Sequence, residues 1–368
     1  MRKTSVGKLI GFFYAILAIF ILISSHSCIK KSAKLASSPY PPSPVITGIT
    51  WDFANILRAA PGSDLWPVSW ADDGRIYTAW GDGGGFGGTN TIGRVSIGVA
   101  RIENFVGNLR YENIFGGVNS NAPATFPGKP TGMICIDGVL YMGVAEEDNW
   151  VRWKIGRSTD YGMTWKFNGT SFDSYWDFAE PDGAFAATAF LNFGKDYQGA
   201  RDDYVYAYSP EGIAENPYDA GKKGVGMFRV PKDKIMDRNE YEYFAGMDGN
   251  NNPQWTKDLT LRKPAFSDPN GVGEVQVVFN PALRRYLLTT WHAKNGSWGI
   301  FDAAEPWGPW TTVAYYEKWI DSTFKFGFTF PQKWMSIDGK TMYMIFSGTK
   351  IYDSFNVIKA MLTVNKAN

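Results

Sequence analysis

Residues Gly62 to Gly88 have the sequence GSDLWPVSWADDGRIYTAWGDGGGFGG, and this stretch decides the fold. Its two arms, Leu65–Trp70 and Arg75–Trp80, are rich in aromatic and β-branched residues, and the Asp-Asp-Gly between them supplies the left-handed conformation of a tight turn. The pattern predicts a β-hairpin with Asp64 and Asp82 at its open end. A three-residue turn places the two carboxylates opposite each other on one face, whereas a two-residue turn places them on opposite faces.

Four further segments repeat the pattern of an apolar strand, a turn and a second strand that carries Tyr or Leu. Together with the first hairpin they centre on Tyr77, Tyr141, Tyr206, Leu288 and Tyr343. Each hairpin is followed by one or two more strand-like segments, such as Ile97–Ile102 and Trp298–Phe301. Five units of about four strands predict an all-β chain folded as a five-bladed β-propeller.

The last unit is one strand short. Its predicted strands are Gly327–Ser336, Thr341–Ser347 and Phe355–Val364, so the segment Ile46–Leu57 is the natural supplier of an outer strand that closes the last blade. Two turn motifs also fit a propeller. Ser158–Trp165 (STDYGMTW) resembles the Asp box of propeller blades, which is a structural turn, and Glu305–Trp310 is its counterpart in the fourth unit.

The N-terminal segment predicts export and a lipid anchor. Residues 1–27 combine a basic start with an apolar run, Leu9–Ile23, that leads into Cys28, which resembles a lipoprotein signal with Cys28 as the lipidated residue. An ordinary cleaved signal and an uncleaved membrane anchor are the alternatives. Residues 28–44 are predicted to form a tether, and residues 45–368 the propeller. We therefore expect a protein anchored by lipid in the bacterial cell envelope, in the outer membrane or facing the periplasm.

The numbers of charged residues, cysteines and histidines limit which partners and catalytic groups the protein can use. After residues 1–27 are removed, 34 Lys and Arg stand against 36 Asp and Glu, which does not favour nucleic acid as a partner. With Cys28 lipidated, Cys135 has no disulfide partner and is predicted to be a buried thiol. His292 is then the only histidine, so a multi-histidine zinc site is excluded. Carboxylates become the default catalytic groups, no metal or other cofactor is expected, and we expect a monomer.

Hairpin pairing predicts which residues gather at the propeller mouth beside Asp64 and Asp82. Lys129 falls opposite Glu146 in the second unit, Asp182 falls near Glu211 in the third, and Pro331 falls opposite Ser347 in the fifth. In the fourth unit, Glu274 lies beside Trp291 and His292. Tryptophans at the flanks offer flat faces for sugar rings, namely Trp66, Trp150, Trp176, Trp291, Trp298 and Trp334.

Each of these residues also has a plainer interpretation. A carboxylate at the end of a strand commonly caps a turn, and large aromatic residues commonly pack one blade against the next. His292 either takes part in chemistry or bonds to Glu274 or to a buried water. Asp64 and Asp82 stand out because they are paired across one hairpin next to a glycine-rich loop.

A family resemblance rests on five motifs. They are residues 63–86 (SDLWPVSWADDGRIYTAWGDGGGF), 128–141 (GKPTGMICIDGVLY), 228–235 (FRVPKDKI) with 242–246 (EYFAG), 273–293 (GEVQVVFNPALRRYLLTTWHA) and 330–348 (FPQKWMSIDGKTMYMIFSG). Together they resemble a propeller family, long catalogued as a domain of unknown function, that includes bacterial endo-D-arabinanases. The resemblance extends over roughly 46–364 and implies a glycosidase-like site with Asp64 and Asp82 as the leading acids.

The sequence thus favours a glycoside hydrolase that acts on an arabinan-like or other polysaccharide. Asp64, Asp82 and Glu274 are the predicted catalytic residues. The predicted substrate-binding residues are Trp66, Lys129, Glu146, Asp182, Glu211, Trp291 and His292. One carboxyl must be protonated to donate to the leaving oxygen, and the other must be ionised as nucleophile or base. The alternatives are a carbohydrate-binding propeller without catalysis and a protein-interaction propeller of the cell envelope.

Overall fold

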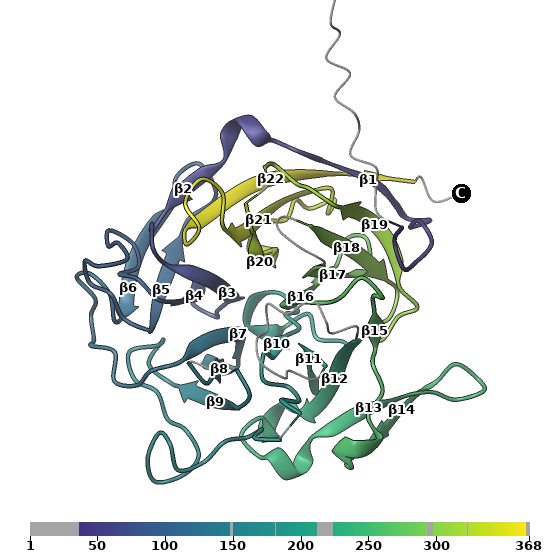
Figure 1. The fold of residues 1–368 in the computed structure, drawn as a ribbon, viewed down its shortest axis with the longest axis horizontal. Coiled ribbons are helices and arrows are strands. Elements are labelled where there is room, and N and C mark those ends of the chain that lie inside the picture. The colour runs from purple at the N-terminus through teal and green to yellow at the C-terminus, as the bar shows by residue number, and fades with distance from the viewer. Residues whose placement is uncertain are drawn as a thin grey trace, which may run out of the picture. The chain divides into compact units, whose positions relative to one another are not determined.

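Five antiparallel sheets follow one another along the chain and form a five-bladed β-propeller, as Figure 1 shows in this computed structural model. The structure describes residues 37–147, 150–180, 182–211, 224–292, 297–321 and 323–365, all within the unit Leu35–Asn368. The predicted propeller is therefore confirmed. The predicted signal segment and Cys28 lie outside the described residues. Among the described helices, none has the length and apolar content needed to cross a membrane.

Blade 1 contains β3 (Asp64–Trp70), β4 (Ile76–Gly81), β5 (Ile97–Glu103) and β6 (Arg110–Phe115). Blade 2 contains β7 (Lys129–Ile136), β8 (Val139–Ala145) and β9 (Trp153–Ser158). Blade 3 contains β10 (Ala189–Phe190), β11 (Tyr204–Pro210), β12 (Gly224–Pro231), β13 (Glu242–Met247) and β14 (Pro253–Thr256), with β15 (Phe266–Ser267) beside β12. Blade 4 contains β16 (Val275–Asn280), β17 (Arg285–Trp291), β18 (Trp298–Ala303) and β19 (Thr311–Tyr316).

Blade 5 contains β20 (Phe326–Thr329), β21 (Thr341–Ser347) and β22 (Phe355–Val364), and it also takes up β1 (Ile46–Trp51) and β2 (Leu57–Ala59). The short 3-10 helices are η1 (Phe53–Asn55), η2 (Lys195–Tyr197), η3 (Lys232–Lys234), η4 (Arg238–Glu240), η5 (Leu259–Leu261) and η6 (Gln332–Trp334). The expected four strands per blade hold for blades 1 and 4. In blade 2 two isolated bridges, Trp153 with Phe178 and Arg157 with Lys166, stand in the place of the fourth strand.

The first hairpin turns over three residues, as one of the two predicted registers requires. The backbone N–H of Ala71 donates to the carbonyl of Arg75 at 2.9 Å, and Trp70 pairs with Ile76. Between Leu65 and Val68, however, a bulge shifts the register by one residue, so that Asp64 pairs with Gly81. The prediction that Asp64 lies directly opposite Asp82 is therefore wrong. Pro67 lies within the bulge. The ladder is irregular there and needs no hydrogen bond from the backbone N–H that proline lacks.

The same kind of irregularity recurs at the inner ends of blades 2 and 5. A shift between Pro130 and Gly132 pairs Lys129 with Ala145 in place of Glu146. In blade 5, Ser347 pairs with Phe326 and not with Pro331, because the chain after Thr329 leaves the sheet and forms η6. Both predicted pairings are corrected by these local departures from a plain hairpin.

The N-terminal strand closes the propeller as predicted. β1 pairs antiparallel with β22 from Ile46 opposite Val364 to Trp51 opposite Ala360, and β2 continues along the same edge. β22 is thereby paired along both edges, with β21 on one side and with β1 and β2 on the other. The contacts begin earlier than the predicted boundary at residue 45. The ring of Tyr40 packs 5.2 Å from Phe266 and 5.8 Å from Phe301, centre to centre, so the end of the predicted tether lies on the propeller.

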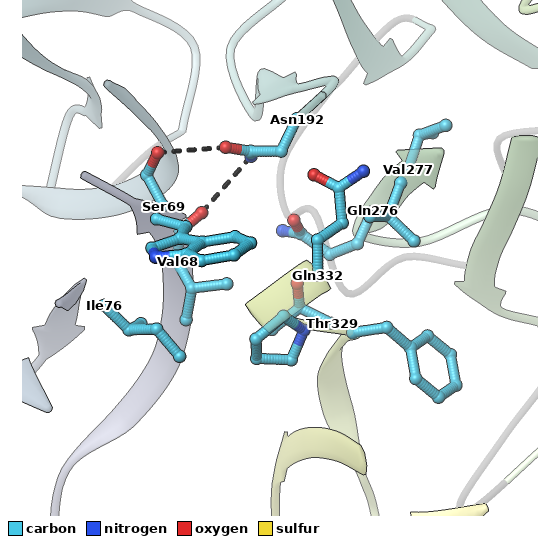
Figure 2. A pocket seen from close by; sticks show the side chains of 12 residues that line it. Val68, Ser69, Ile76, Asn192, Gln276, Val277, Thr329 and Gln332 are labelled. Atoms are coloured by element: carbon cyan, nitrogen blue, oxygen red, sulfur yellow. Dashed lines mark hydrogen bonds between the residues drawn. The ribbon is translucent and has the colours of Figure 1, made fainter. Parts of the chain in front are cut away.

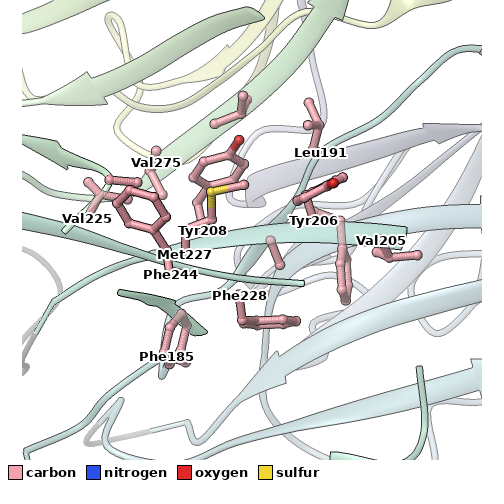
Figure 3. Packing of buried hydrophobic residues seen from close by; sticks show 14 of the residues in the cluster. Phe185, Leu191, Val205, Tyr206, Tyr208, Val225, Met227, Phe228, Phe244 and Val275 are labelled. Carbon is pink, nitrogen blue, oxygen red and sulfur yellow. The ribbon is translucent and has the colours of Figure 1, made fainter. Parts of the chain in front are cut away.

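The core lies between neighbouring blades and consists mainly of aromatic and branched side chains. Figure 3 shows the part of the largest cluster that surrounds β11 and β12, where Tyr206, Tyr208 and Phe228 are all buried. The rings of Phe185 and Phe228 meet edge to face at 5.2 Å. Burial of such large rings is the main stabilising contribution in the described part of the chain, where no disulfide forms. Cys135 is a buried free thiol, as predicted.

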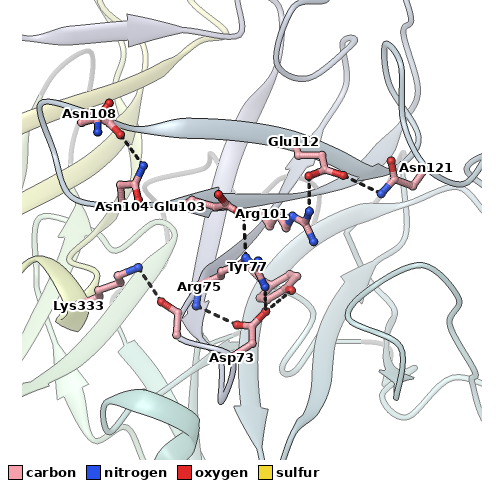
Figure 4. A network of polar contacts seen from close by, with 11 residues as sticks. Asp73, Arg75, Tyr77, Arg101, Glu103, Asn104, Asn108, Glu112, Asn121 and Lys333 are labelled. Atoms are coloured by element: carbon pink, nitrogen blue, oxygen red, sulfur yellow. Dashed lines mark hydrogen bonds and ion pairs between the residues drawn. The ribbon is translucent and has the colours of Figure 1, made fainter.

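Polar contacts fix the turn end of the hairpins, opposite the mouth. Around the first turn, Asp73 accepts hydrogen bonds from Arg75 and Tyr77, and Arg75 also pairs with Glu103 at 2.8 Å (Figure 4). In the Asp box, Thr164 donates its backbone N–H to Asp160 at 2.9 Å. These hydrogen bonds stabilise the turns, in agreement with the interpretation of the Asp box as a structural turn.

Candidate active site at the propeller mouth

The mouth opens where the inner strands begin. Directly beneath it is a constriction of about 10 Å³, room for about one water molecule. All five blades contribute to its wall: Leu65 and Pro67, Pro130 and Thr131, Ala187, Glu274 to Gln276, and Gly327. Glu274 therefore lies on the propeller axis. The hairpin argument placed Glu274 at this end of blade 4, opposite Trp291, and the pairing of Val275 with Thr290 confirms that register.

Asp64 is buried at the start of β3, and its Oδ1 has no hydrogen-bond partner among the described residues. Burial raises the pKa of Asp64 well above its usual range, and the charges of Asp353, Asp82 and Glu274 raise it further, whereas Lys129 opposes the shift. The carboxyl of Asp64 fits against Gly81 because glycine has no side chain. A Cβ atom on Gly81 would lie 2.8 Å from Oδ1 of Asp64.

Asp82 has a different environment, although it lies in the same hairpin. It follows the last residue of β4 with a left-handed backbone (φ 53°), which turns the chain out of the sheet. Its Oδ1 accepts from the ammonium of Lys129 at 2.5 Å and pairs with the guanidinium of Arg94 at 3.0 Å. About a quarter of the side chain (26%) is exposed. Two cations thus contact one oxygen of a partly exposed carboxylate.

Glu274 is the third buried carboxyl. Burial raises its pKa to about 8, and the neighbouring backbone N–H of Gly327 offsets part of that effect. Neither of its oxygens makes a hydrogen bond of ordinary geometry within the described part of the chain. At neutral pH this side chain is therefore mainly protonated, and it can donate a proton into the mouth.

The sequence did not predict three residues of the mouth. Asp353 and Tyr352 lie in the loop between β21 and β22, and Arg94 lies in the loop between β4 and β5. Burial raises the pKa of Asp353, and the charge of Asp82 adds to the shift. The Tyr352 ring is 52% exposed and stacks on Phe324 with ring centres 6.1 Å apart. The charges of Asp353, Glu274 and Asp64 all act on the Tyr352 hydroxyl, so this exposed ring borders the acids.

Residues 61–358 match the model of a protein family described as "Domain of unknown function (DUF4185)". The chain belongs to this DUF4185 family. The match spans all five blades of the propeller. A comparison with curated protein sequences gives no match.

Solved structures are similar to this chain at low identity. A presumed hydrolase from Bacteroides ovatus is 11% identical with a TM-score of 0.51, over 84% of this chain and 87% of the other. A GH43_1 enzyme from Xanthomonas citri is 11% identical with a TM-score of 0.44, over 91% and 94%. Xylan β-1,4-xylosidase from Bacillus halodurans is 10% identical with a TM-score of 0.45, over 82% and 53%. At such identity, the Bacteroides ovatus structure supports the propeller fold alone.

Several residues predicted to bind substrate are packing residues in this DUF4185 propeller. Trp66 is fully buried and packs on Phe355 with ring centres 5.0 Å apart. Trp291 is buried and meets Phe324 edge to face at 5.2 Å. Of the other predicted platforms, Trp150, Trp298 and Trp334 are buried as well. Their rings hold the blades together, so a flat sugar-binding face must come from elsewhere.

His292 is also part of the core. Its side chain is completely buried and its ring stacks on Tyr315 of β19 at 3.8 Å, nearly parallel. Burial lowers the pKa of His292 to about 4, so the ring is neutral at neutral pH. Neither ring nitrogen has a side-chain partner of ordinary geometry among the described residues. The predicted hydrogen bond to Glu274 is absent from that set.

The remaining predicted acids form pairs outside the Asp64 cluster. Glu146 pairs with Arg152 rather than with Lys129. Asp182 and Glu211 do come together, as predicted, but through Arg262, which lies 2.6 Å from Asp182 and 3.4 Å from Glu211. These three carboxylates are engaged by arginine.

Below the constriction, the axis is lined by uncharged residues, both apolar and polar (Figure 2). Asn192 reaches across to blade 1, where its amide accepts from Ser69 at 3.0 Å and donates to the carbonyl of Val68 at 3.2 Å. Near the far end, Asp72, Cys135 and Asp196 bring three ligand atoms within 4.8 Å of one another, the one such group in the described residues. The Cys135 thiol donates to Asp196 at 3.3 Å, so this group is already joined by a hydrogen bond.

Proposed function

We propose that this chain is a glycoside hydrolase whose proton donor is Asp64 and whose nucleophile or base is Asp82. One observation carries the proposal: two carboxyls of one hairpin have opposite environments. Asp64 is buried beside three other carboxyls, whereas Asp82 is held by Lys129 and Arg94. Glycoside hydrolysis requires one neutral and one ionised carboxyl at the same site, and environment divides these roles.

In the proposed reaction, Asp64 gives its proton to the glycosidic oxygen, and the bond from that oxygen to the anomeric carbon breaks with its electron pair moving to the oxygen. Asp82 either attacks the anomeric carbon or takes a proton from a water that attacks it. Glu274 is an alternative donor, because its pKa of about 8 also keeps it protonated at neutral pH. The bulge removes the direct pairing of Asp64 with Asp82, so the strand register does not decide between these two roles of Asp82.

The proposed substrate is an arabinan-like or other neutral polysaccharide. With Asp64 and Glu274 protonated, the remaining carboxylates of the mouth, Asp82 and Asp353, are balanced by Lys129 and Arg94. Such a mouth carries little net charge and favours a neutral sugar. The exposed ring of Tyr352 offers the flat face that the buried tryptophans do not. The location we propose is the cell envelope, through the predicted lipid anchor at Cys28.

The test is a screen of the chain from residue 29 onward against arabinan, xylan and other furanose- or pyranose-containing polysaccharides, with release of reducing ends as the readout. We expect wild-type protein to cleave at least one of them and the Asp64→Asn variant to be inactive while it keeps its melting temperature. Absence of cleavage across the screen, or full activity of the Asp64→Asn variant, would contradict the proposal.

A carbohydrate-binding propeller without catalysis is the second candidate. The observation that favours it is that both cations contact the same oxygen of Asp82, which leaves that atom less available as a nucleophile. Binding of a polysaccharide without release of reducing ends, unchanged in the Asp64→Asn variant, would decide for this alternative.

A further inference from the structure

Blade 2 carries a second cavity next to the mouth. We call it the blade-2 pocket; its volume is about 200 Å³, and its principal lining residues are Glu146, Glu147, Arg152, Phe172, Asp173 and Trp176. It adjoins the proposed catalytic centre, because Oε1 of Glu147 lies 3.9 Å from the ammonium of Lys129, which in turn contacts Asp82. A polymer that crosses the mouth would therefore pass over or into this cavity.

One wall of the pocket is aromatic and rigid. The rings of Phe172 and Trp176 meet edge to face at 6.1 Å, and the guanidinium of Arg152 lies 4.6 Å from the centre of the Trp176 ring. Behind this wall, Lys154 is 99% buried, with its ammonium nitrogen 3.6 Å from the ring centre of Phe172 and 3.9 Å from that of Trp176. The cation holds both rings from behind, so the wall is preformed.

Unused hydrogen-bonding atoms accompany this wall. Oε2 of Glu146 and Nε1 of Trp176 are buried, and neither has a partner among the described residues. The ammonium of Lys154 has no hydrogen-bond partner there either. An unsatisfied buried polar atom is costly, and it calls for a water or a ligand group. Both atoms lie beneath the pocket surface, so a sugar hydroxyl can donate to Glu146 and accept from Trp176 once these side chains turn towards the ligand, which an apolar ligand cannot do.

Charge decides which kind of sugar fits. Three carboxylates line the pocket, those of Glu146, Glu147 and Asp173, against the guanidinium of Arg152 and the ammonium of Lys154 behind the wall. This excess of negative charge disfavours uronate, sulfate or phosphate groups. The volume suits one ring and is smaller than a typical pocket for a drug-sized ligand.

We propose that the blade-2 pocket is a subsite for one neutral sugar residue of the chain whose scissile bond lies at Asp64 and Asp82, and this assignment rests on the proposed function. The sugar packs its apolar face on Trp176 and Arg152 and uses Glu146 as an acceptor. The pocket would then make the enzyme favour longer oligosaccharides over shorter ones.

The experiment is calorimetric titration of the Asp64→Asn protein with arabinofuranose and xylose oligosaccharides from disaccharide to hexasaccharide. This variant is used because it should not hydrolyse the oligosaccharides during the titration. We expect Trp176→Ala to weaken binding of the longer oligosaccharides by about tenfold, as loss of an aromatic anchor does, and to leave the disaccharide unaffected. Asp173→Trp fills the pocket from an exposed position and should have the same effect even if Trp176→Ala is unstable.

The matched control is Trp255→Ala. Trp255 lies on β14, the outer strand of blade 3, is partly buried like Trp176, and also stacks on an arginine, with Arg229 4.4 Å from its ring centre. The Trp255→Ala variant should bind oligosaccharides of every length as its parent does. If polysaccharide is cleaved and both pocket variants bind all lengths like their parent, the subsite is wrong and the proposed function stands. If wild-type protein neither binds nor cleaves any sugar, both proposals fall.

Discussion

The ammonium of Lys129 lies 2.5 Å from Oδ1 of Asp82, so a cation of blade 2 holds a carboxylate of blade 1 at the mouth. Lys129 is itself buried to about nine tenths. A buried cation is costly without a partner, and Asp82 supplies one. The ion pair therefore joins two blades, and it gives Asp82 a cationic partner while burial raises the pKa of Asp64, on the other strand of the hairpin.

Asp82→Asn should lower the rate of polysaccharide cleavage by about 10²–10⁴-fold, because the ionised carboxylate is lost while the hydrogen-bonding shape is kept. Reducing-end release under saturating substrate measures this. Asp203→Asn is the matched control, since the Asp203 side chain is 87% exposed and, among the described residues, forms an ion pair only with Lys232, at the turn end of the hairpins. Equal rates for the two variants would remove Asp82 from the reaction.

Glu274→Gln should change how stability depends on pH. The folded-state pKa of Glu274, about 8, lies above its unfolded value, so the folded protein holds a proton that the unfolded chain releases. Wild-type stability should therefore fall as pH rises from about 4.5 towards 8 and level off above. The variant lacks this contribution, so its stability relative to wild type should improve over that range. Urea denaturation at pH 5 and pH 8 tests this, and parallel changes in both proteins would refute it.

Gly81→Ala should reduce activity more than stability. The added Cβ would lie 2.8 Å from both Oδ1 of Asp64 and Cδ1 of Leu65, which must move, and 3.3 Å from Cδ of Lys129, which must yield slightly. Small displacements of catalytic groups are expensive in rate, and we expect a loss of about 10²-fold. Gly249→Ala is the control, because a Cβ there meets nothing within 4 Å. Comparable cleavage rates for the two alanine variants would show that Asp64 is not held against Gly81.

Deletion of residues 45–58 should cause aggregation, because it removes β1 and most of β2 and exposes the edge of β22. Deletion of residues 29–36 should leave the melting temperature unchanged and serves as the control. Light scattering and thermal unfolding report the two effects. A soluble protein with an undiminished melting temperature after the first deletion would contradict the role of β1 as the closing strand.

Cys28→Ser should release the protein from the membrane fraction into the soluble fraction, because the predicted acyl chains attach to this cysteine. Fractionation of cells that express wild-type and variant chains measures the distribution. If wild-type protein is already soluble, the lipid anchor does not exist.

The hairpins, their order and the closing strand were predictable, since each is local or repeated in the sequence. The bulges were not, although Pro67 and Pro130 gave a signal: a residue without an N–H in an inner strand favours an irregular ladder. Asp353 and Arg94 were missed because both lie in loops, whose position is set by tertiary packing. All the predicted tryptophan platforms except Trp176 are buried, because composition cannot tell a ring that faces a neighbouring blade from one that faces solvent.

The pairing of β1 with β22 also sets the timing of folding during synthesis. β1 leaves the ribosome first, but its partner is made last, so the fifth blade can form only when nearly the whole chain is available. The mouth depends on that blade as well, because Asp353 and Tyr352 lie just before β22. An incomplete chain therefore cannot assemble the acid cluster, and a protein exported while still unfolded would complete its site only after it has crossed the membrane.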